Sequence, residues 1–348
     1  MNVKQGLEEI KKIAVVGAGA WGSALAFHLA AKGLKVSLWC LEEEVAVQIE
    51  DERENKEYLP GVVLPELIRP STDIEKVVRG NRIVLMAVPS QFTRGVVSSL
   101  KEYLSPGVIL VSASKGIENG TLMTMTQIFE DVLPDDLAVH RAVLSGPSFA
   151  KEVGRGLPTA VTVACPDREA STIIQHVFAS PTLRIYTSQD VMGVELGGAL
   201  KNVIALATGI SDGLEMGVNA RAALITRGLA EMSRLGVKMG ANPLTFSGLA
   251  GLGDLVLTCT SDLSRNRSTG LKLGQGLKLA DILKNTKEVV EGVKTTRSAV
   301  DLAAREEVGI PLTQEVFEVL YRDKTPLQAL YDLMKRDLKS ELDSRILF

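Results

Sequence analysis

Three glycines near the start of the chain have the spacing of a phosphate-binding loop. Gly17, Gly19 and Gly22 fit G-x-G-x-x-G, directly after the apolar run 13–16 and directly before the helix-forming run 23–27. In a strand–turn–helix setting the first glycine permits a sharp turn, the second lets a pyrophosphate approach the backbone, and the third packs helix against strand. The helix N-terminus adds free N–H groups and a partial positive charge. The spacing therefore predicts a dinucleotide-binding loop rather than a tight turn without a ligand.

An acidic residue follows this loop at the distance expected for a ribose contact. Glu42 lies about 20 residues after Gly22, where a carboxylate would accept a hydrogen bond from the 2′-hydroxyl of an adenosine ribose. No Arg or Lys occurs between Lys35 and Arg53, so an obvious clamp for a 2′-phosphate is missing. We therefore expect NAD rather than NADP. The alternative is that the glutamates at 42–44 simply open a helix, where acidic residues suit the helix dipole.

One lysine, Lys201, stands in the otherwise apolar, helix-compatible segment 195–202, which also holds Gly197 and Gly198. Each glycine in a helix costs roughly 1 kcal/mol relative to alanine, and this cost is more easily explained if something packs closely on that face. A lysine so surrounded is partly desolvated, which lowers its pKa toward values useful for acid–base chemistry. The alternative is a surface lysine whose ammonium group reaches into water.

Further polar clusters stand where ligands are expected. Two polar segments each follow a short apolar run: 114–116, which contains Lys115, and 145–149. Open α/β sheets bind ligands beyond the ends of their strands. In the second half of the chain, Arg265 is suited to bidentate phosphate binding, and Asn266 could donate a hydrogen bond beside it.

Short apolar runs and helix-forming stretches alternate over residues 1–189. The runs show little alternation of apolar and polar residues, as expected of parallel strands covered on both faces. Helix-forming segments such as 23–32 and 91–103 lie between them. This order predicts a doubly wound α/β sheet. The expected strands are 13–16, 36–39, 83–88, 108–112, 142–144 and 160–164.

Beyond about residue 190 the strand-like runs nearly vanish. Long helix-compatible segments follow, at 191–212, 220–235, 295–307 and 311–321. We therefore expect two domains: residues 1–189 with the sheet, and residues 190–348 as an all-α domain, with the boundary near 185–192.

Composition narrows the classes of partner. The 348 residues are 45% hydrophobic, 23% charged and only 4% aromatic, with a net charge of −3, so neither a nucleic acid nor an anionic membrane surface is expected as a partner. The three cysteines, Cys40, Cys165 and Cys259, are far apart. They form neither a disulfide framework nor a paired-thiolate metal site, which indicates a reducing compartment. No secretory signal is visible, and the charge-free stretch 13–31 is interrupted by glycines, so we expect a cytoplasmic protein without membrane insertion.

Eight segments, in collinear order from about residue 12 to 335, together resemble one known family. They are GAGAWG, SKGIE, SGPSFAKEV, ELGGALKNVIALATGISDGL, NARAALITRGL, GLAGLGDLVLTC, SRNRSTG and VVEGVKT. This set is similar to the bacterial-type NAD(P)-dependent glycerol-3-phosphate dehydrogenases.

The resemblance implies a two-domain enzyme. Its N-terminal domain would be a Rossmann-like doubly wound sheet, and its all-α C-terminal domain would be of the 6-phosphogluconate dehydrogenase C-terminal type. The enzyme would interconvert dihydroxyacetone phosphate and sn-glycerol 3-phosphate for glycerophospholipid synthesis, using NAD or NADP and no metal. Lys201 would donate or accept the proton at the carbinol oxygen, and Asp254 and Thr258 would position it and connect it to solvent. A homodimer is expected from the apolar helical half.

The resemblance also implies the remaining site residues. Cofactor contacts would come from Gly17, Gly19, Ala20, Trp21, Gly22, Glu42, Lys115, Ala150, Arg265, Val289 and Glu291. Substrate contacts would come from Lys115, Gly146, Ser148, Lys201, Asn202, Asp254, Ser264, Arg265 and Asn266. Relatives often carry a basic residue at or next to Leu41 and Glu42, and its absence here puts their usual NADP preference in doubt.

Two alternatives remain at this point. A β-hydroxyacid dehydrogenase of the 6-phosphogluconate dehydrogenase type shares the two-domain plan, but it would need a Lys-x-x-x-Asn helix, whereas Asn202 follows Lys201 at once. A nicotinamide-binding module without catalysis would not need Lys201, Asp254 and Arg265, yet all three are present. We also expect part of the glycine content, 31 residues in all, to mark places where the backbone approaches a ligand, at 17–22, 116, 146, 197–198 and 251–253.

Overall fold

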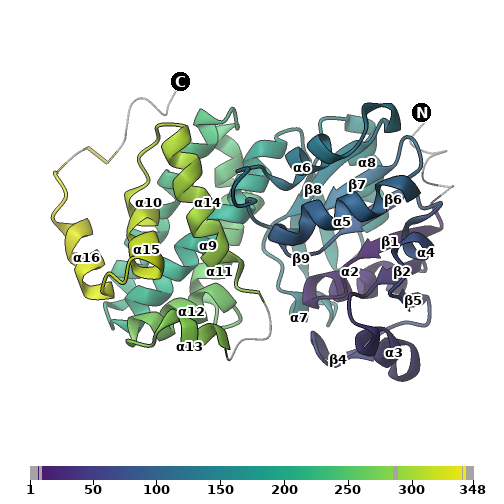
Figure 1. Cartoon of the computed structure of the whole chain (residues 1–348), viewed down its shortest axis with the longest axis horizontal. Coiled ribbons are helices and arrows are strands. Elements are labelled where there is room, and N and C mark those ends of the chain that lie inside the picture. Colours follow the sequence, from purple (N-terminus) through teal and green to yellow (C-terminus); the bar gives the residue numbers. More distant parts are fainter. Residues whose placement is uncertain (1–6, 8–9, 285–288, 339, 342–348) are drawn as a thin grey trace. The chain divides into compact units, whose positions relative to one another are not determined.

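The computed structural model describes Leu7 and residues 10–284, 289–338 and 340–341. These residues form two compact units (Figure 1). The sheet unit comprises residues 1–114 and 125–191, and the helical unit comprises residues 115–124 and 192–348.

The sheet unit is built on eight strands in the order β10-β9-β8-β7-β6-β1-β2-β5. The chain runs from β1 to β2 and β5 on one side, then returns to β6 beside β1 and continues outward on the other side. The point where the strand order reverses therefore lies at β1 and β6. The strands are β1 (Lys12–Val16), β2 (Lys35–Trp39), β5 (Ile68–Ser71), β6 (Ile83–Met86), β7 (Ile109–Ser112), β8 (His140–Ser145), β9 (Thr159–Ala164) and β10 (Leu183–Ser188).

Strand β1 shows why these runs do not alternate. Ile13 and Val15 pack into a core that includes residues of α2, α3 and α8, whereas Ala14 and Val16 pack into a second core with α4, α5 and α6. Both faces are buried, so both sets of positions are apolar. The prediction of a doubly wound sheet is confirmed. The helices are α2 (Ala20–Ala31), α3 (Glu43–Glu52), α4 (Ile74–Val78), α5 (Thr93–Leu100), α6 (Met125–Val132), α7 (Ala150–Val153) and α8 (Arg168–Phe178).

One expected strand runs in the other direction. The segment 160–164 was expected as a parallel strand, but β9 pairs with β8 in antiparallel register, with Val143 opposite Ala164. β9 begins at the edge of the sheet where β8 ends, so the chain needs no long crossover. A strand buried on both faces is apolar in either direction, which is why its sequence does not reveal the direction.

The sheet unit also contains strands that the sequence reading missed. β5 and β10 join the two edges of the main sheet, and β3 (Glu54–Asn55) and β4 (Leu59–Val63) form a separate antiparallel hairpin. The hairpin is short and rich in charged and turn residues, so it lacks the apolar run by which the other strands were recognised.

The helical unit forms around α9 (Val191–Gly213), in which every residue from Gly193 to Ser211 is buried. Among the described residues, α9 is the one helix long and apolar enough to cross a membrane, but 89% of the relevant window is buried inside the protein. It is therefore a core helix. The other helices are α10 (Gly217–Lys238), α11 (Asp254–Thr260), α12 (Arg265–Gly274), α13 (Leu279–Lys284), α14 (Glu291–Arg305), α15 (Pro311–Tyr321) and α16 (Pro326–Met334). The prediction of an all-α second half is confirmed.

Helices α9 and α12 pack against each other at four glycines, Gly209 and Gly213 on α9 and Gly270 and Gly274 on α12. We call this contact the glycine seam. A Cβ on Gly209 would overlap with the carbonyl oxygen of Arg267, and a Cβ on Gly270 would overlap with that of Leu206. The two helix backbones are therefore in direct contact at the seam, which no larger residue would allow.

Residues 115–124 were expected in the first domain, but they belong to the helical unit. Ile117 is fully buried in the core of that unit, and its carbonyl oxygen accepts a 3.0 Å hydrogen bond from Ser298 Oγ on α14. The buried Ile117 side chain anchors this otherwise polar segment and thereby places Lys115 in the helical unit.

Candidate active site

The glycine loop follows β1 at the point where the strand order reverses. Gly17 has φ of +112°, a conformation that favours glycine, and a Cβ on it would lie 2.8 Å from the carbonyl oxygen of Ala87, just after β6. A Cβ on Gly22 would overlap with the carbonyl oxygen of Gly17. Gly17 therefore lets the turn pack against the end of β6, and Gly22 lets the start of α2 pack against the backbone of Gly17.

Gly19 differs from its neighbours, because a Cβ on it would meet nothing within 4 Å. It is the N-cap of α2, it makes no side-chain capping bond, and Ala20 begins the helix. The indole Nε1 of Trp21 is buried and has no hydrogen-bond partner in the protein. A bound pyrophosphate would use the open space at Gly19 and the free N–H groups at the start of α2. It would also offer an acceptor to the unsatisfied indole N–H of Trp21. The loop therefore fits a dinucleotide.

Glu42 lies three residues after β2 and is the N-cap of α3. Its Oε1 accepts a 3.1 Å hydrogen bond from the hydroxyl of Tyr58, a residue that the sequence reading missed. No motif pointed to Tyr58, since it lies in the unrecognised β3–β4 hairpin.

The predicted substrate residues of the sheet unit follow β8. Gly146 has φ of +144°, and a Cβ on it would lie 3.0 Å from Val161 Cα on β9. Ser148 Oγ donates a 2.9 Å hydrogen bond to the carbonyl oxygen of Gly146, and Ala150 begins α7. A side-chain hydrogen bond within the loop thus holds it, and Gly146 is required for close packing on β9 rather than solely for a ligand.

The helical unit brings four predicted residues into one cluster, which we call the lysine–aspartate cluster. The ammonium groups of Lys201 and Lys115 bind opposite oxygens of the Asp254 carboxylate, with Lys115 Nζ 2.6 Å from Oδ2. Lys201 Nζ also donates to Thr258 Oγ1 at 2.8 Å, and Thr258 Oγ1 donates to the backbone oxygen of Asp254. These bonds fix the position of the Lys201 ammonium group, so Lys201 is not a surface lysine whose ammonium group moves freely in water.

Burial gives this cluster its electrostatics. The Asp254 side chain is 1% exposed and that of Lys201 is 8% exposed. Burial lowers the pKa of Lys201 from its ordinary value of 10.5 to about 8, with a smaller contribution from the charge of Lys115, while the carboxylate of Asp254 opposes the decrease. Two ammonium groups facing one carboxylate leave an excess positive charge, which suits an anionic ligand and a proton donor.

Two close backbone contacts set the position of Asp254. It begins α11 directly after the π-helical turn Leu249–Gly253. A Cβ on Gly197 of α9 would lie 2.5 Å from the carbonyl oxygen of Ala250, and a Cβ on Gly251 would overlap with the backbone of Phe246. The expectation that these two glycines face a ligand is corrected: Gly197 lets the turn approach α9, which carries Lys201, and Gly251 packs against the backbone of Phe246.

A second group of predicted residues joins α9, α12 and α14. Asn266 Nδ2 donates to Asn202 Oδ1 at 2.9 Å, and Asn266 Oδ1 accepts a 2.9 Å bond from the backbone N–H of Gly292. Ser264 is the N-cap of α12, accepting from Arg267 N. Arg265 is exposed and donates to the carbonyl oxygen of Val289 at 3.2 Å, next to Glu291 at the start of α14. The structure therefore brings these residues together. The hydrogen bonds of Asn202 and Asn266 also link α9, α12 and α14.

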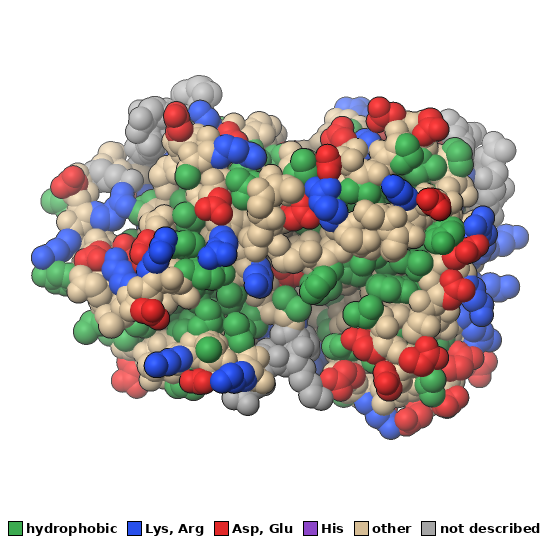
Figure 2. Space-filling view, in the orientation of Figure 1, with side chains coloured by type: hydrophobic (Ala, Val, Ile, Leu, Met, Phe, Trp, Pro, Cys, Tyr) green, Lys and Arg blue, Asp and Glu red, His purple; other side chains and the backbone are tan. Residues whose placement is uncertain are grey.

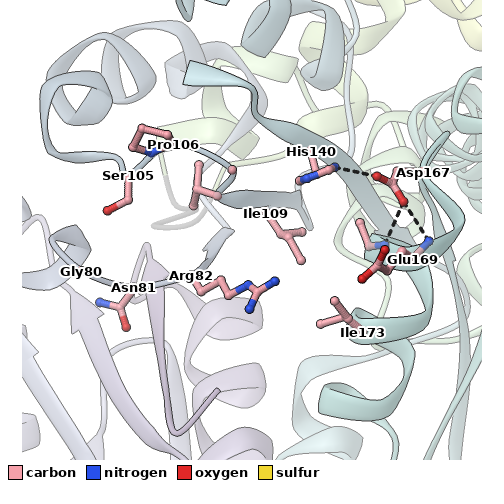
Figure 3. Close-up of a pocket in the computed structure, with 13 residues that line it drawn as sticks. Gly80, Asn81, Arg82, Ser105, Pro106, Ile109, His140, Asp167, Glu169 and Ile173 are labelled. Atoms are coloured by element: carbon pink, nitrogen blue, oxygen red, sulfur yellow. Dashed lines mark hydrogen bonds and ion pairs between the residues drawn. The ribbon is translucent and has the colours of Figure 1, made fainter. Parts of the chain in front are cut away.

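A cavity of about 450 Å³ lies elsewhere in the sheet unit (Figure 3). It is lined by Ile109 and His140, the first residues of β7 and β8. Asp167 there binds His140 Nδ1 at 2.9 Å and caps α8 through Glu169 N and Ala170 N. The cavity is at the edge where the strands begin, whereas the glycine loop and Gly146 follow strand ends. It is therefore separate from the predicted cofactor site.

Comparison with known proteins identifies the family. The model of the NAD-dependent glycerol-3-phosphate dehydrogenase N-terminus matches residues 12–171, and that of the C-terminus matches residues 190–331. The chain belongs to this family. It is 54% identical over 331 residues to the glycerol-3-phosphate dehydrogenase [NAD(P)+] of Geobacter sulfurreducens, and these cover 95% of this chain and 99% of the relative. The enzyme of the same name from Syntrophobacter fumaroxidans is 53% identical, with 95% and 97% covered.

Solved structures agree with this membership. The glycerol-3-phosphate dehydrogenase of Coxiella burnetii is 40% identical and superposes with a TM-score of 0.89, covering 94% of this chain and 99% of that one. A ketopantoate reductase family protein from Ralstonia eutropha, 16% identical with a TM-score of 0.60 over 92% and 99% of the two chains, shares the fold. The family match favours this assignment over the 6-phosphogluconate-type dehydrogenase.

Proposed function

We propose that the protein catalyses reversible hydride transfer between NAD(P)H and dihydroxyacetone phosphate, giving sn-glycerol 3-phosphate for glycerophospholipid synthesis. The observation that carries this proposal is the buried Lys201 held by Asp254 and Thr258 in the helical unit. A ketone reductase needs such a proton donor. The names of the relatives in Geobacter and Syntrophobacter support the choice of substrate.

Lys201 would act as the general acid in reduction and as the general base in oxidation. NAD(P)H, when bound, supplies the hydride to the carbonyl carbon. Lys201 gives its Nζ proton to the carbonyl oxygen, so the ketone becomes an alcohol and the lysine becomes neutral. The low pKa of Lys201 makes this transfer easier than from an ordinary ammonium. Asp254 and Thr258 hold the amine and link it toward solvent for reprotonation, and the reverse reaction uses the neutral amine as base.

The substrate phosphate would be held by cationic and polar groups of the helical unit. Lys115 adds positive charge beside Asp254, and Arg265 offers an exposed guanidinium at the start of α12. Ser264, Asn266 and Asn202 would complete this end of the site. Gly146 and Ser148 of the sheet unit would also contact the substrate.

The cofactor would be held mainly by the sheet unit. Gly17, Gly19, Ala20, Trp21 and Gly22 would carry its pyrophosphate at the start of α2. Contacts with its nicotinamide half would come from Ala150, Lys115, Arg265, Val289 and Glu291. We propose residues 1–189 as the cofactor domain and 190–348 as the substrate domain, with the segment 115–124 assigned to the latter.

We propose NAD as the preferred cofactor. A 2′-phosphate would bring negative charge beside Glu42, and like charges at this distance repel. The exposed residues Glu43 and Glu44 follow Glu42 directly at the start of α3, and Figure 2 shows acidic side chains gathered over α3. Arg53 is paired with Glu50 at 3.9 Å, and its guanidinium also donates to the carbonyl oxygens of Leu64, Pro65 and Ile68, so it is already engaged by other residues. A strong preference for NADPH in kcat/KM would refute this part.

The deciding experiment is a spectrophotometric assay of NADH oxidation with dihydroxyacetone phosphate. We expect turnover that depends on both reactants, and none with a β-hydroxyacid such as 6-phosphogluconate when assayed in the oxidative direction. A folded protein that binds NADH but does not turn over dihydroxyacetone phosphate would overturn the proposal.

We further propose a cytoplasmic homodimer. Support for the dimer comes from large apolar side chains left exposed on the helical unit, such as Val218, which is 71% exposed, and Leu244. Sedimentation equilibrium at micromolar concentration would test it, and a monomer mass would contradict it.

A further inference from the structure

The β3–β4 hairpin lies between the two parts of the sheet unit that would bind the adenosine half of a dinucleotide. β3 contacts α3, which Glu42 caps, and β4 contacts α2, which follows the glycine loop. Two side chains of the hairpin segment, Asn55 and Tyr58, make hydrogen bonds to these parts.

Asn55 joins the hairpin to the glycine loop. It is completely buried, and its Nδ2 donates to the carbonyl oxygen of Ala18 at 2.7 Å and to Ser23 Oγ at 2.9 Å. Ser23 Oγ itself donates to Ala18 O. The peptide between Gly17 and Gly19 is thus held by a buried side chain from outside the loop.

Tyr58 extends the same network to Glu42. Its backbone N–H donates to Asn55 Oδ1 at 3.1 Å, so the buried asparagine also sets the position of the tyrosine. Its ring packs against the core of the sheet unit. Its hydroxyl donates to Glu42 Oε1 at 3.1 Å. A glutamate has three flexible torsions, whereas a packed tyrosine ring has little freedom, so this bond restricts the carboxylate.

We propose that Tyr58 is a positioning residue that holds the Glu42 carboxylate for the adenosine ribose and thereby increases selection of NAD over NADP, with Asn55 aligning this carboxylate with the glycine loop. The inference rests on the proposed role of Glu42. Without the Tyr58 hydroxyl the carboxylate is free to turn away. NADH then loses an ordered acceptor for its 2′-hydroxyl, while NADPH loses part of a repulsion.

The test compares Tyr58→Phe, Glu42→Gln and the double variant with the parent protein. Tyr186→Phe is the matched control, because Tyr186 is exposed on β10 of the same unit. The Kd of NADH and of NADPH for the free protein is measured by calorimetry, and thermal unfolding checks the fold. KM and kcat for both cofactors are then measured with dihydroxyacetone phosphate.

We expect Tyr58→Phe to raise the Kd and KM for NADH by about 3–10-fold, consistent with one ordered hydrogen bond, and to leave kcat within about twofold. The Kd of NADPH should stay the same or fall. The double variant should match Glu42→Gln, because Tyr58 acts through Glu42. Tyr186→Phe should change neither Kd.

Two results would overturn the inference in different ways. If Glu42→Gln weakens NADH binding but Tyr58→Phe does not, or if the two losses add in the double variant, Tyr58 does not position Glu42. If Glu42→Gln leaves NADH binding unchanged, the proposed role of Glu42 fails as well. Because Kd is measured without substrate, both results are distinguishable from an absence of dehydrogenase activity.

Discussion

The glycine loop of the sheet unit and the glycine seam of the helical unit use one residue type in two ways. A Cβ on Gly19 would meet nothing within 4 Å, whereas a Cβ on Gly270 would overlap with the backbone of α9. Gly19 leaves room for a ligand beside a helix N-terminus. Gly270 and its partners in the seam bring the backbones of α9 and α12 into contact. A glycine in this chain therefore does not by itself indicate that the backbone approaches a ligand.

The sheet unit and the helical unit also differ in the chemical groups that they offer to a ligand. In the sheet unit the groups suited to bind a ligand are mostly backbone N–H groups at the start of α2, which do not titrate. In the helical unit they are charged side chains: the buried Lys201 and Asp254 and the partly buried Lys115. We therefore expect variants of the two units to separate binding of the cofactor from catalysis.

The largest expected effect is that of Lys201→Ala. Removing the proton donor should lower kcat for dihydroxyacetone phosphate reduction by about 10²–10⁴-fold, while the Kd of NADH stays near that of the parent. Steady-state assays and calorimetry measure these values. Lys272→Ala, at an exposed lysine of α12, is the control and should retain full activity. Near-normal turnover by Lys201→Ala would show that Lys201 is not the proton donor.

The next effect concerns the seam. Gly270→Ala should lower the free energy of unfolding by about 3 kcal/mol or more, because its methyl group would overlap with backbone rather than with a flexible side chain. Urea denaturation measures the change. Gly309→Ala is the control in the same unit, since a Cβ there meets nothing within 4 Å. A Gly270→Ala protein as stable as the parent would mean that the seam is not closely packed in solution.

A third effect is the dependence of the rate on pH. Reduction requires the protonated amine of Lys201, so kcat/KM for dihydroxyacetone phosphate should fall about tenfold per unit as pH rises above about 8. Oxidation of glycerol 3-phosphate requires the neutral amine, so its kcat/KM should rise with pH up to about 8 and then level off. The Kd of NADH should not follow this titration. Parallel pH profiles in the two directions would contradict the assignment of Lys201.

The smallest effect is expected at the loop. Gly19 has φ of −64°, so alanine is conformationally allowed there, and Gly19→Ala should change stability by less than about 1 kcal/mol. Its methyl group would occupy the space left for the pyrophosphate, and the Kd of NADH should rise about tenfold, or about 1.4 kcal/mol. Gly95→Ala, at an exposed glycine within α5, is the control. Unchanged NADH binding by Gly19→Ala would place the pyrophosphate elsewhere.

Features that depend on neighbouring residues could be predicted from the sequence. The strand, turn and helix from Lys12 to Ala31 are local, because strand burial, glycine spacing and helix formers all act within about 20 residues. Lys201 was recognisable for the same reason, since a charge inside an apolar helical segment is locally anomalous. The family resemblance supplied the roles of Asp254 and Thr258.

Features that depend on distant pairing could not be predicted. The direction of β9 follows from its partner β8 and leaves no trace in a strand buried on both faces. Asn55 and Tyr58 lie in a short hairpin without an apolar pattern, and their importance comes from Ala18 and Glu42, 37 and 16 residues away.

The sequence by itself determined two things about this protein: a nucleotide-type loop and an apolar helix with one lysine. Both are local, because they depend on backbone geometry and solvation within a few turns. Only the tertiary structure decided that Lys115 joins Lys201 on the carboxylate of Asp254, and that Gly197 and Gly251 face protein backbone. The physical reason is that burial and close packing are properties of surfaces brought together by the whole chain, and the pKa of Lys201 follows from them.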